Sequence, residues 1–169
     1  MSDFLVLTVI ADDKPGIVEQ LSTVIADHGG NWLESRMAQM AGKFAGILRI
    51  SIDSPQKSKL VAALSSLDSS GLQVRIEAPV TEKEYLATHS ITLSVVGNDR
   101  PGIVREVSQT LARVGVNVLE LSTHCESAEM SAVPLFRSEI SASIPDSLDH
   151  DDVSAALEAL SDDLMVEVY

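Results

Sequence analysis

The chain contains an internal sequence repeat, and this repeat constrains the fold more than any other feature. When residues 7–37 are laid over residues 93–123 with a constant offset of 86 and no gaps, thirteen positions are identical. In the first copy these positions are Leu7, Val9, Asp13, Pro15, Gly16, Ile17, Val18, Ser22, Ala26, Gly29, Asn31, Leu33 and Glu34. An offset of this length is too long for a solenoid repeat and indicates a duplicated small domain. We expect domains at residues 1–80 and 89–169, joined by a polar linker at 81–88.

Within each copy the hydrophobic periodicity changes in the same order. The first segment alternates with a period of two, which predicts a strand with one buried face. In the second copy its apolar members are Ile91, Leu93 and Val95, and its polar members are Ser90, Thr92 and Ser94. The next segment has three- and four-residue spacing and ends at a glycine, which predicts a helix. Its members are Ile17, Leu21, Val24 and Ile25 before Gly29, and Ile103, Val107, Leu111 and Val114 before Gly115.

Three strands and a second helix complete each copy. The second strands are expected at 31–40 and 117–125, the third at 44–52 and 135–144, the second helices at 57–67 and 151–160, and the fourth strands at 72–77 and 164–168. The order βαββαβ predicts an α+β protein with two ferredoxin-like domains, each a four-stranded antiparallel sheet with two helices on one face.

The face of each sheet opposite the helices must contact either solvent or another protein surface. In the first copy its outward positions include Phe4 and Val6, where the second copy has Ser90 and Thr92. We therefore expect the first outer face to be covered, either by the other copy or by a second chain.

Composition excludes several classes of protein. The chain is 45% apolar, which is enough to form a core, yet it has no apolar run long enough to span a membrane. The net charge is −13, and no basic stripe is available to bind a nucleic-acid backbone directly. The single cysteine, Cys125, fits a reducing compartment. We expect a cytoplasmic protein that contacts neither nucleic acid nor membrane.

Both copies place the same motif, Asp-basic-Pro-Gly-Ile-Val, between the first strand and the first helix. It spans residues 13–18 in the first copy and 99–104 in the second. Glycine lets backbone N–H groups approach a ligand closely, and the free N–H groups at a helix start attract anions. Another interpretation needs no ligand: the aspartate caps the helix, the proline starts it and the glycine makes the turn.

An α-amino acid carries a carboxylate beside an ammonium group, so its receptor needs backbone donors beside an acceptor. This loop offers both kinds of group. The basic residue and the Gly-Ile pair are candidates for the carboxylate, and the acidic and amide side chains before them are candidates for the ammonium group. The candidate ligand-binding residues are Asp12, Asp13, Lys14, Pro15, Gly16, Ile17 and Asn31 in the first copy, and Asn98, Asp99, Arg100, Pro101, Gly102, Ile103 and Asn117 in the second.

The element order, this motif and the Gly-x-Asn-x-Leu-Glu segment leading into each second strand resemble the ACT domain across nearly the whole chain. This resemblance implies an amino-acid-sensing regulatory module whose effector commonly lies at an interface between domains and contacts the loop between the first strand and the first helix. Two such domains with nothing else attached look like the family of glycine cleavage system transcriptional repressors, which act through a partner activator. The resemblance therefore implies a small amino acid, with glycine suspected, a DNA-binding activator and a homo-oligomer as partners. Asp12 against Asn98, and Trp32 against Val118, indicate that the two sites need not bind the same ligand.

No enzymatic constellation or metal site is indicated, and no cofactor is expected. His124 and Cys125 are adjacent on an expected strand and should point to opposite faces, so they do not form a catalytic pair. Cys125 is expected to be a small buried or half-buried residue. The acidic residues from 149 to 163 match no calcium loop, and Asp151 or Asp152 is expected to cap the second helix. Trp32, Met37 and Met40 are expected to serve core or interface packing.

Three functions remain open from the sequence. The first is a free-standing, non-enzymatic transcriptional regulator that senses a small ligand and acts through another protein. The second is a regulatory subunit that binds and controls a metabolic enzyme. The third is a structural adaptor whose loops bind nothing.

Overall fold

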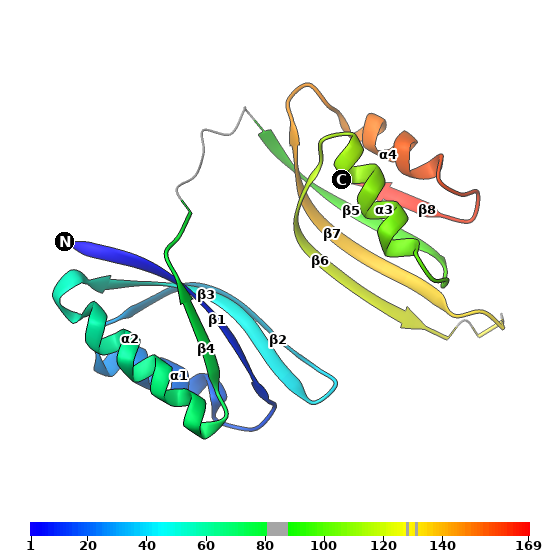
Figure 1. Cartoon of the computed structure of the whole chain (residues 1–169). Coiled ribbons are helices and arrows are strands. Elements are labelled where there is room, and N and C mark those ends of the chain that lie inside the picture. Colours follow the sequence, from blue (N-terminus) through cyan, green and yellow to red (C-terminus); the bar gives the residue numbers. More distant parts are fainter. Residues whose placement is uncertain (81–87, 128, 131) are drawn as a thin grey trace. The chain divides into compact units, whose positions relative to one another are not determined.

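The computed structural model describes residues 1–80, 88–127, 129–130 and 132–169, and it contains two βαββαβ units (Figure 1). The first unit consists of β1 (Ser2–Asp12), α1 (Ile17–Asp27), β2 (Asn31–Met40), β3 (Lys43–Asp53), the short 3₁₀ helix η1 (Ser54–Gln56), α2 (Lys57–Ser66), η2 (Leu67–Ser70) and β4 (Gln73–Glu77). The second consists of β5 (Thr88–Asn98), α3 (Ile103–Arg113), β6 (Asn117–Glu126), β7 (Leu135–Pro145), α4 (His150–Glu158) and β8 (Met165–Val168). The chain divides into compact units Met1–Thr81 and Glu82–Tyr169. The expected linker lies outside the described residues apart from Thr88, which begins β5.

Each unit has one four-stranded sheet, with the strand order β2-β3-β1-β4 in the first and β6-β7-β5-β8 in the second. Every neighbouring pair is antiparallel. Both helices of each unit cover the same face of its sheet (Figure 1). The predicted ferredoxin-like fold is therefore confirmed in both copies.

The core of each unit lies between the sheet and its helices, as the two periodicities predicted. In β1 every second residue is buried, with Leu5, Leu7 and Val9 exposing no more than 3% of their surface. In the second unit the same alternation buries Ile91, Leu93 and Val95. The helices contribute their apolar stripes to these cores, which include Ile17, Leu21, Ile25, Leu60 and Leu64 in the first unit and Ile103, Val107, Leu111, Val153 and Leu157 in the second.

The strand after the first helix carries an irregularity that sequence reasoning missed. The register of β2 on β3 shifts between Trp32 and Glu34, and that of β6 on β7 shifts between Val118 and Glu120. The extra residue is a leucine in both copies, Leu33 and Leu119. Such a bulge increases the local twist and redirects the side chains that follow it. The Asn-x-Leu-Glu segment shared by the two copies thus forms a β-bulge in the edge strand of each sheet.

The start of α4 corrects one prediction. Asp149 is the N-cap residue, and its carboxylate accepts a hydrogen bond from the Asp152 amide at 2.9 Å. The Asp152 carboxylate in turn accepts from the Asp149 amide at 3.2 Å. The prediction that Asp151 or Asp152 caps this helix is therefore wrong, because the helix begins earlier, at His150, and Asp152 acts as the third residue of a capping box.

Candidate functional site

The loop between the first strand and the first helix turns through a left-handed glycine in both domains. Gly16 precedes α1 with φ 91° and ψ 3°, and Gly102 precedes α3 with φ 88° and ψ 0°. A residue with a Cβ pays a steric penalty in this conformation because the Cβ crowds the following carbonyl oxygen. The turn itself therefore requires the glycine of the motif.

Neither helix start has a side-chain cap. Gly16 and Gly102 occupy the N-cap positions, and among the residues that the structure describes no side chain caps α1 or α3. Pro15 and Pro101 lie one residue outside the helices. The interpretation in which an aspartate caps the helix and the proline starts it is therefore wrong for both motifs. A glycine cap has no side-chain acceptor, so the first-turn amides of α1 have no side-chain partner among the described residues.

In the first domain the loop is tied to the neighbouring β2–β3 hairpin. The Asp13 amide donates to the Gly42 carbonyl at 2.9 Å. The Lys43 ammonium group donates to the Asp12 carboxylate, and this hydrogen bond lowers the pKa of Asp12. Asp12 is thus engaged by Lys43, whereas the Asp13 carboxylate has no ion pair within the described residues. Of the two acids, Asp13 is the better placed to meet an ammonium group.

A hollow of about 270 Å³ lies against this loop. Its lining residues are Asp13, Lys14, Gly16, Ile17, Val18, Glu19 and Phe44. Lys14 is exposed and makes no ion pair in the part of the chain that the structure describes. The hollow therefore brings together a lysine, the two carboxylates of Asp13 and Glu19, and the amides of a helix start, which are groups that can meet the carboxylate and the ammonium group of a small zwitterion.

In the second domain the equivalent cation is already engaged. The Arg100 guanidinium donates to the Glu106 carboxylate on α3, with 2.6 Å between Nη2 and Oε2. This hydrogen bond raises the pKa of Arg100 and lowers the pKa of Glu106. The backbone differs as well, because the Ile103 amide donates to the Arg100 carbonyl at 3.4 Å. The Arg100 side chain is therefore already paired with a carboxylate of the protein itself.

Sequence reasoning missed Glu106, although the repeat carried the signal. The same offset that pairs Lys14 with Arg100 pairs Gln20 with Glu106. Gln20 is uncharged, and its side-chain amide donates to the Ser70 hydroxyl at 2.9 Å. The first loop therefore lacks a carboxylate at the position of Glu106, although Glu19 in the first turn of α1 also lines its hollow.

The two asparagines do not join the loop within a domain. Asn31 lies opposite Ser51, which faces Phe4 on β1, whereas Asp12 lies at the other end of β1. Eight residues of strand separate Phe4 from Asp12, which is about 27 Å. Asn117 is removed from the second loop in the same way, because it lies opposite Ser143, which in turn lies opposite Ser90 near the start of β5. One amino acid cannot touch both the loop and the asparagine of the same domain.

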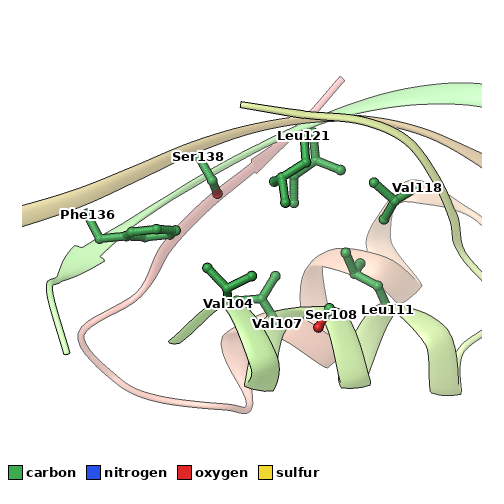
Figure 2. A pocket seen from close by; sticks show the side chains of 9 residues that line it. Val104, Val107, Ser108, Leu111, Val118, Leu121, Phe136 and Ser138 are labelled. Atoms are coloured by element: carbon green, nitrogen blue, oxygen red, sulfur yellow. The ribbon is translucent and has the colours of Figure 1, made fainter. Parts of the chain in front are cut away.

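A second, apolar hollow of about 30 Å³ lies between α3 and β6, beside the second loop (Figure 2). It is lined by Val104, Val107, Ser108, Leu111, Val118, Leu121, Phe136, Ser138 and Ile140. Val104 and Val107 point from the helix toward Leu121 on the strand in Figure 2. No motif predicted this groove, because Val118 and Leu121 are exposed apolar positions on the edge strand β6 and the remaining strand residues belong to β7.

The equivalent groove in the first domain is filled. Trp32 and Met37 stand where the second domain has Val118 and Thr123, and both pack against the first core. Met37 lies over Gly46, where an added Cβ would overlap it. The packing role expected for Trp32 and Met37 is confirmed, whereas Met40 is 73% exposed and lies outside the core.

Cys125 differs from its expectation, because it is exposed. Partial desolvation and the nearby Asp99 carboxylate raise the pKa of its thiol, which lowers its nucleophilicity at neutral pH. The described residues contain no group of three or more His, Cys, Asp or Glu side chains placed to hold a metal ion. Within the same residues no helix has both the length and the apolar character needed to cross a membrane.

Comparison with known proteins agrees with this architecture. Two family models of the ACT domain match the chain, one at residues 3–77 and one at residues 91–164. The glycine cleavage system transcriptional repressor of Escherichia coli strain K12 is 24% identical over 163 residues, covering 95% of this chain and 85% of the relative. The protein of the same name from Shigella flexneri matches to the same extent.

Two crystal structures share the fold over essentially the whole chain. An unknown protein from Galdieria sulphuraria has a TM-score of 0.82 and 27% identity, covering 99% of this chain and 98% of that one. A candidate glycine cleavage system transcriptional repressor has a TM-score of 0.70 and 19% identity, covering 100% and 98%. The similarity to regulatory proteins supports a regulatory role for this chain. The chain belongs to the ACT domain family and carries two ACT domains in tandem.

Proposed function

We propose that this protein is a non-enzymatic, cytoplasmic regulator of transcription in amino-acid metabolism, with the glycine cleavage system as its target. It senses a small amino acid, glycine first among the candidates, and acts through contact with a DNA-binding activator. The observation that carries the sensing step is the uncapped helix start behind Gly16, beside the exposed Lys14. The similarity to the Escherichia coli repressor supports the regulatory output.

The first loop is the effector site in this proposal. The effector carboxylate accepts from the amides that follow Gly16 and from the Lys14 ammonium group, while the Asp13 carboxylate faces the effector ammonium group. The second loop is closed to the same effector, because Glu106 already satisfies Arg100 at 2.6 Å. A second carboxylate there would meet like-charge repulsion from Glu106.

Direct contact with DNA is not part of this function. The net charge of −13 opposes binding to a phosphate backbone. Effector binding instead biases the population of the form that binds the activator. We expect the protein to act as a homo-oligomer.

The test is calorimetric titration of the full chain with glycine and then with a panel of other small amino acids. We expect one saturable site in the wild-type protein. Lys14→Gln should weaken binding by about tenfold or more, because it removes a charge-assisted hydrogen bond. Gln20→Glu, which copies the second loop into the first, should weaken it similarly.

The matched control is Glu106→Gln, which copies the first loop into the second. It should leave the original site intact and open a weaker second site at Arg100. Absence of heat with every amino acid in the millimolar range would contradict sensing. Binding that is lost in Arg100→Gln but unaffected by Lys14→Gln would show that the effector binds to the second loop, which would contradict the assignment to the first.

The regulatory output has a separate test. The purified DNA-binding activator of the glycine cleavage genes is mixed with this chain, with and without the effector, and complex formation is measured by sedimentation. We expect a complex whose affinity depends on the effector. Binding to a glycine cleavage enzyme instead of the activator would favour a regulatory subunit of an enzyme.

A further inference from the structure

The strand β6, at the edge of the second sheet, exposes apolar side chains beside α3. Val118, Leu119 and Leu121 on β6 are 39%, 60% and 47% exposed, and Val104 on α3 is 42% exposed. Val104, Val118 and Leu121 line the α3–β6 groove, and Figure 2 shows Val104 pointing across it toward Leu121. An apolar strand edge adds a further strand readily, so folded proteins usually keep such edges charged or covered.

The equivalent edge of the first sheet, at β2, has no open apolar groove. Trp32 and Met37 fill that position from within the domain and pack against its core. Ser35 stands where the second domain has Leu121. The same fold therefore forms without an open groove at this edge. The exposed apolar side chains of β6 serve something other than folding.

On its other side, β6 borders a polar hollow of about 170 Å³. Glu120 and Ser122 on β6 and Glu139 on β7 are among the residues that line it. Ser122 lies opposite the exposed Glu139, whereas Leu121 lies opposite the buried Ile140. Successive residues of β6 therefore face the carboxylate-lined hollow and the apolar groove in turn. One strand edge thus presents an acidic side and an apolar side.

The acidic side of this edge lacks the cation that the first sheet provides. In the first sheet Glu34 lies 3.0 Å from the Arg49 guanidinium. The apolar Ile47, 50% exposed on that outer face, stands where the second sheet has Glu139. Glu139 forms no ion pair in the part of the chain that the structure describes. The hollow of the second sheet is therefore complementary to a cationic side chain from another molecule.

We propose that the free edge of β6 binds an extended segment of a partner protein in which aliphatic and basic residues alternate. The segment adds a strand about 4.8 Å from β6 and forms main-chain hydrogen bonds with it. Because the side chains of a strand alternate between its two faces, the aliphatic residues enter the α3–β6 groove and the basic residues reach Glu120 and Glu139. The groove, of about 30 Å³, suits the tip of one aliphatic side chain and excludes an aromatic ring.

This inference goes beyond the proposed function. Neither the effector nor the identity of the activator enters the argument, because both hollows and the strand between them belong to the second domain. Failure of the peptide experiment below would leave amino-acid sensing at the first loop untouched, and the reverse also holds.

Fluorescence anisotropy of the full chain with a labelled synthetic peptide tests the proposal. The probe is Lys-Val-Lys-Val-Lys-Val-Lys with blocked termini, and we expect saturable binding at low salt. The block peptide Lys-Lys-Lys-Lys-Val-Val-Val has the same composition and charge. It should bind about tenfold more weakly or less, because it cannot place aliphatic and basic residues on opposite faces.

Two N-methylated probes test the main-chain hydrogen bonds. One carries methyl groups on its valine amides and the other on its lysine amides. Only alternate amides of an added strand face β6, so one of the two probes should lose binding and the other should keep it. Retention of binding by both probes would overturn strand addition.

Three protein variants locate the site. Leu121→Ser, which copies Ser35 of the first domain, should weaken binding by about tenfold or more, because it removes the apolar contact. Glu139→Gln should weaken it by about two- to fivefold at low salt, and this effect should fade as salt is added. Ser35→Ala is the matched control at the first edge and should change nothing. Circular dichroism checks that each variant is folded, and all three positions are exposed.

Several outcomes would overturn the proposal. These are absence of binding into the millimolar range, equal binding of the alternating and block peptides, and full binding to the folded Leu121→Ser variant. Sedimentation equilibrium tests a different occupant. A wild-type oligomer that Leu121→Ser dissociates would place a second copy of the chain at this edge and would also overturn the proposal.

Discussion

The Arg100 guanidinium and the Glu106 carboxylate, 2.6 Å apart, form an ion pair inside the loop that begins α3. The first domain has Lys14 and Gln20 at these two positions and forms no such pair. Two loops with the same motif therefore differ in whether their cation is available, and this difference has a direct consequence for the pH dependence of stability.

We expect the Arg100–Glu106 pair to stabilise the second domain at neutral pH and not in acid. The pair lowers the pKa of Glu106 in the folded protein, so the unfolded chain binds the proton more tightly. Its contribution is therefore full above the unfolded-state pKa of about 4.3 and disappears as the pH falls through the lowered pKa of the folded state. A double-mutant cycle of Arg100→Gln and Glu106→Gln, measured by urea unfolding, should show favourable coupling at neutral pH and none in strong acid. Equal coupling at both pH values would contradict this account.

Gly16→Ala should lower the free energy of unfolding by about 1–2 kcal/mol, because alanine must adopt the left-handed conformation at φ 91°. No atom lies within 4 Å of the added Cβ, so the loss is conformational and not a clash. Gly16→Asn is the matched control and should lose less, since asparagine tolerates this region better. Urea unfolding measures both. Equal losses in the two variants would show that steric crowding, and not the backbone conformation, sets the cost.

Asp149→Ala should destabilise the protein by about 1 kcal/mol, because it removes the N-cap acceptor of α4. Asp151→Ala is the control and should change stability by less than about 0.5 kcal/mol, since Asp151 is an exposed position within the helix. Thermal or urea unfolding followed by circular dichroism separates the two. A larger loss of stability for Asp151→Ala than for Asp149→Ala would show that Asp151 caps the helix, as the sequence predicted.

Thr110→Val should stabilise the second domain by about 1 kcal/mol. The Thr110 hydroxyl is buried, with 3% of the residue exposed, and it has no hydrogen-bond partner among the residues described. Valine has nearly the same shape and removes the cost of the unsatisfied hydroxyl. The first domain already has Val24 at this position, so Val24→Thr is the reciprocal variant and should destabilise by a similar amount. Loss of stability in Thr110→Val would indicate that the hydroxyl is hydrogen-bonded in solution.

The repeat and its periodicities predicted the fold because both signals are local. A period of two along β1 and β5, and a helical period along α1 and α3, determine which side chains face the core, and the observed burial follows them. The first residue of a helix was harder to predict. His150 is polar and carries no periodicity, so the sequence placed the start of α4 too late and assigned its cap to Asp151 or Asp152 instead of Asp149.

The loop motif was located from the sequence, but its chemistry was not fully assigned. The left-handed glycine moves the N-cap to Gly16 and Gly102, which rules out capping by the aspartates. The asparagines at the start of β2 and β6 were predicted to join the loop because the resemblance to the ACT domain includes them. Strand register instead places Asn31 and Asn117 at the far end of each sheet.

By itself the sequence determined the duplication, the βαββαβ order, the buried faces and the position of the two loops, because these depend on spacing along the chain. Only the tertiary structure decided which loop has an available cation, which groove is filled and where the outer face is apolar. Each of these depends on residues far apart in sequence or on different elements, such as Met37 over Gly46 and Ile47 beside Thr8. Strand register and side-chain packing bring those residues together, and spacing along the chain does not encode the distance between them.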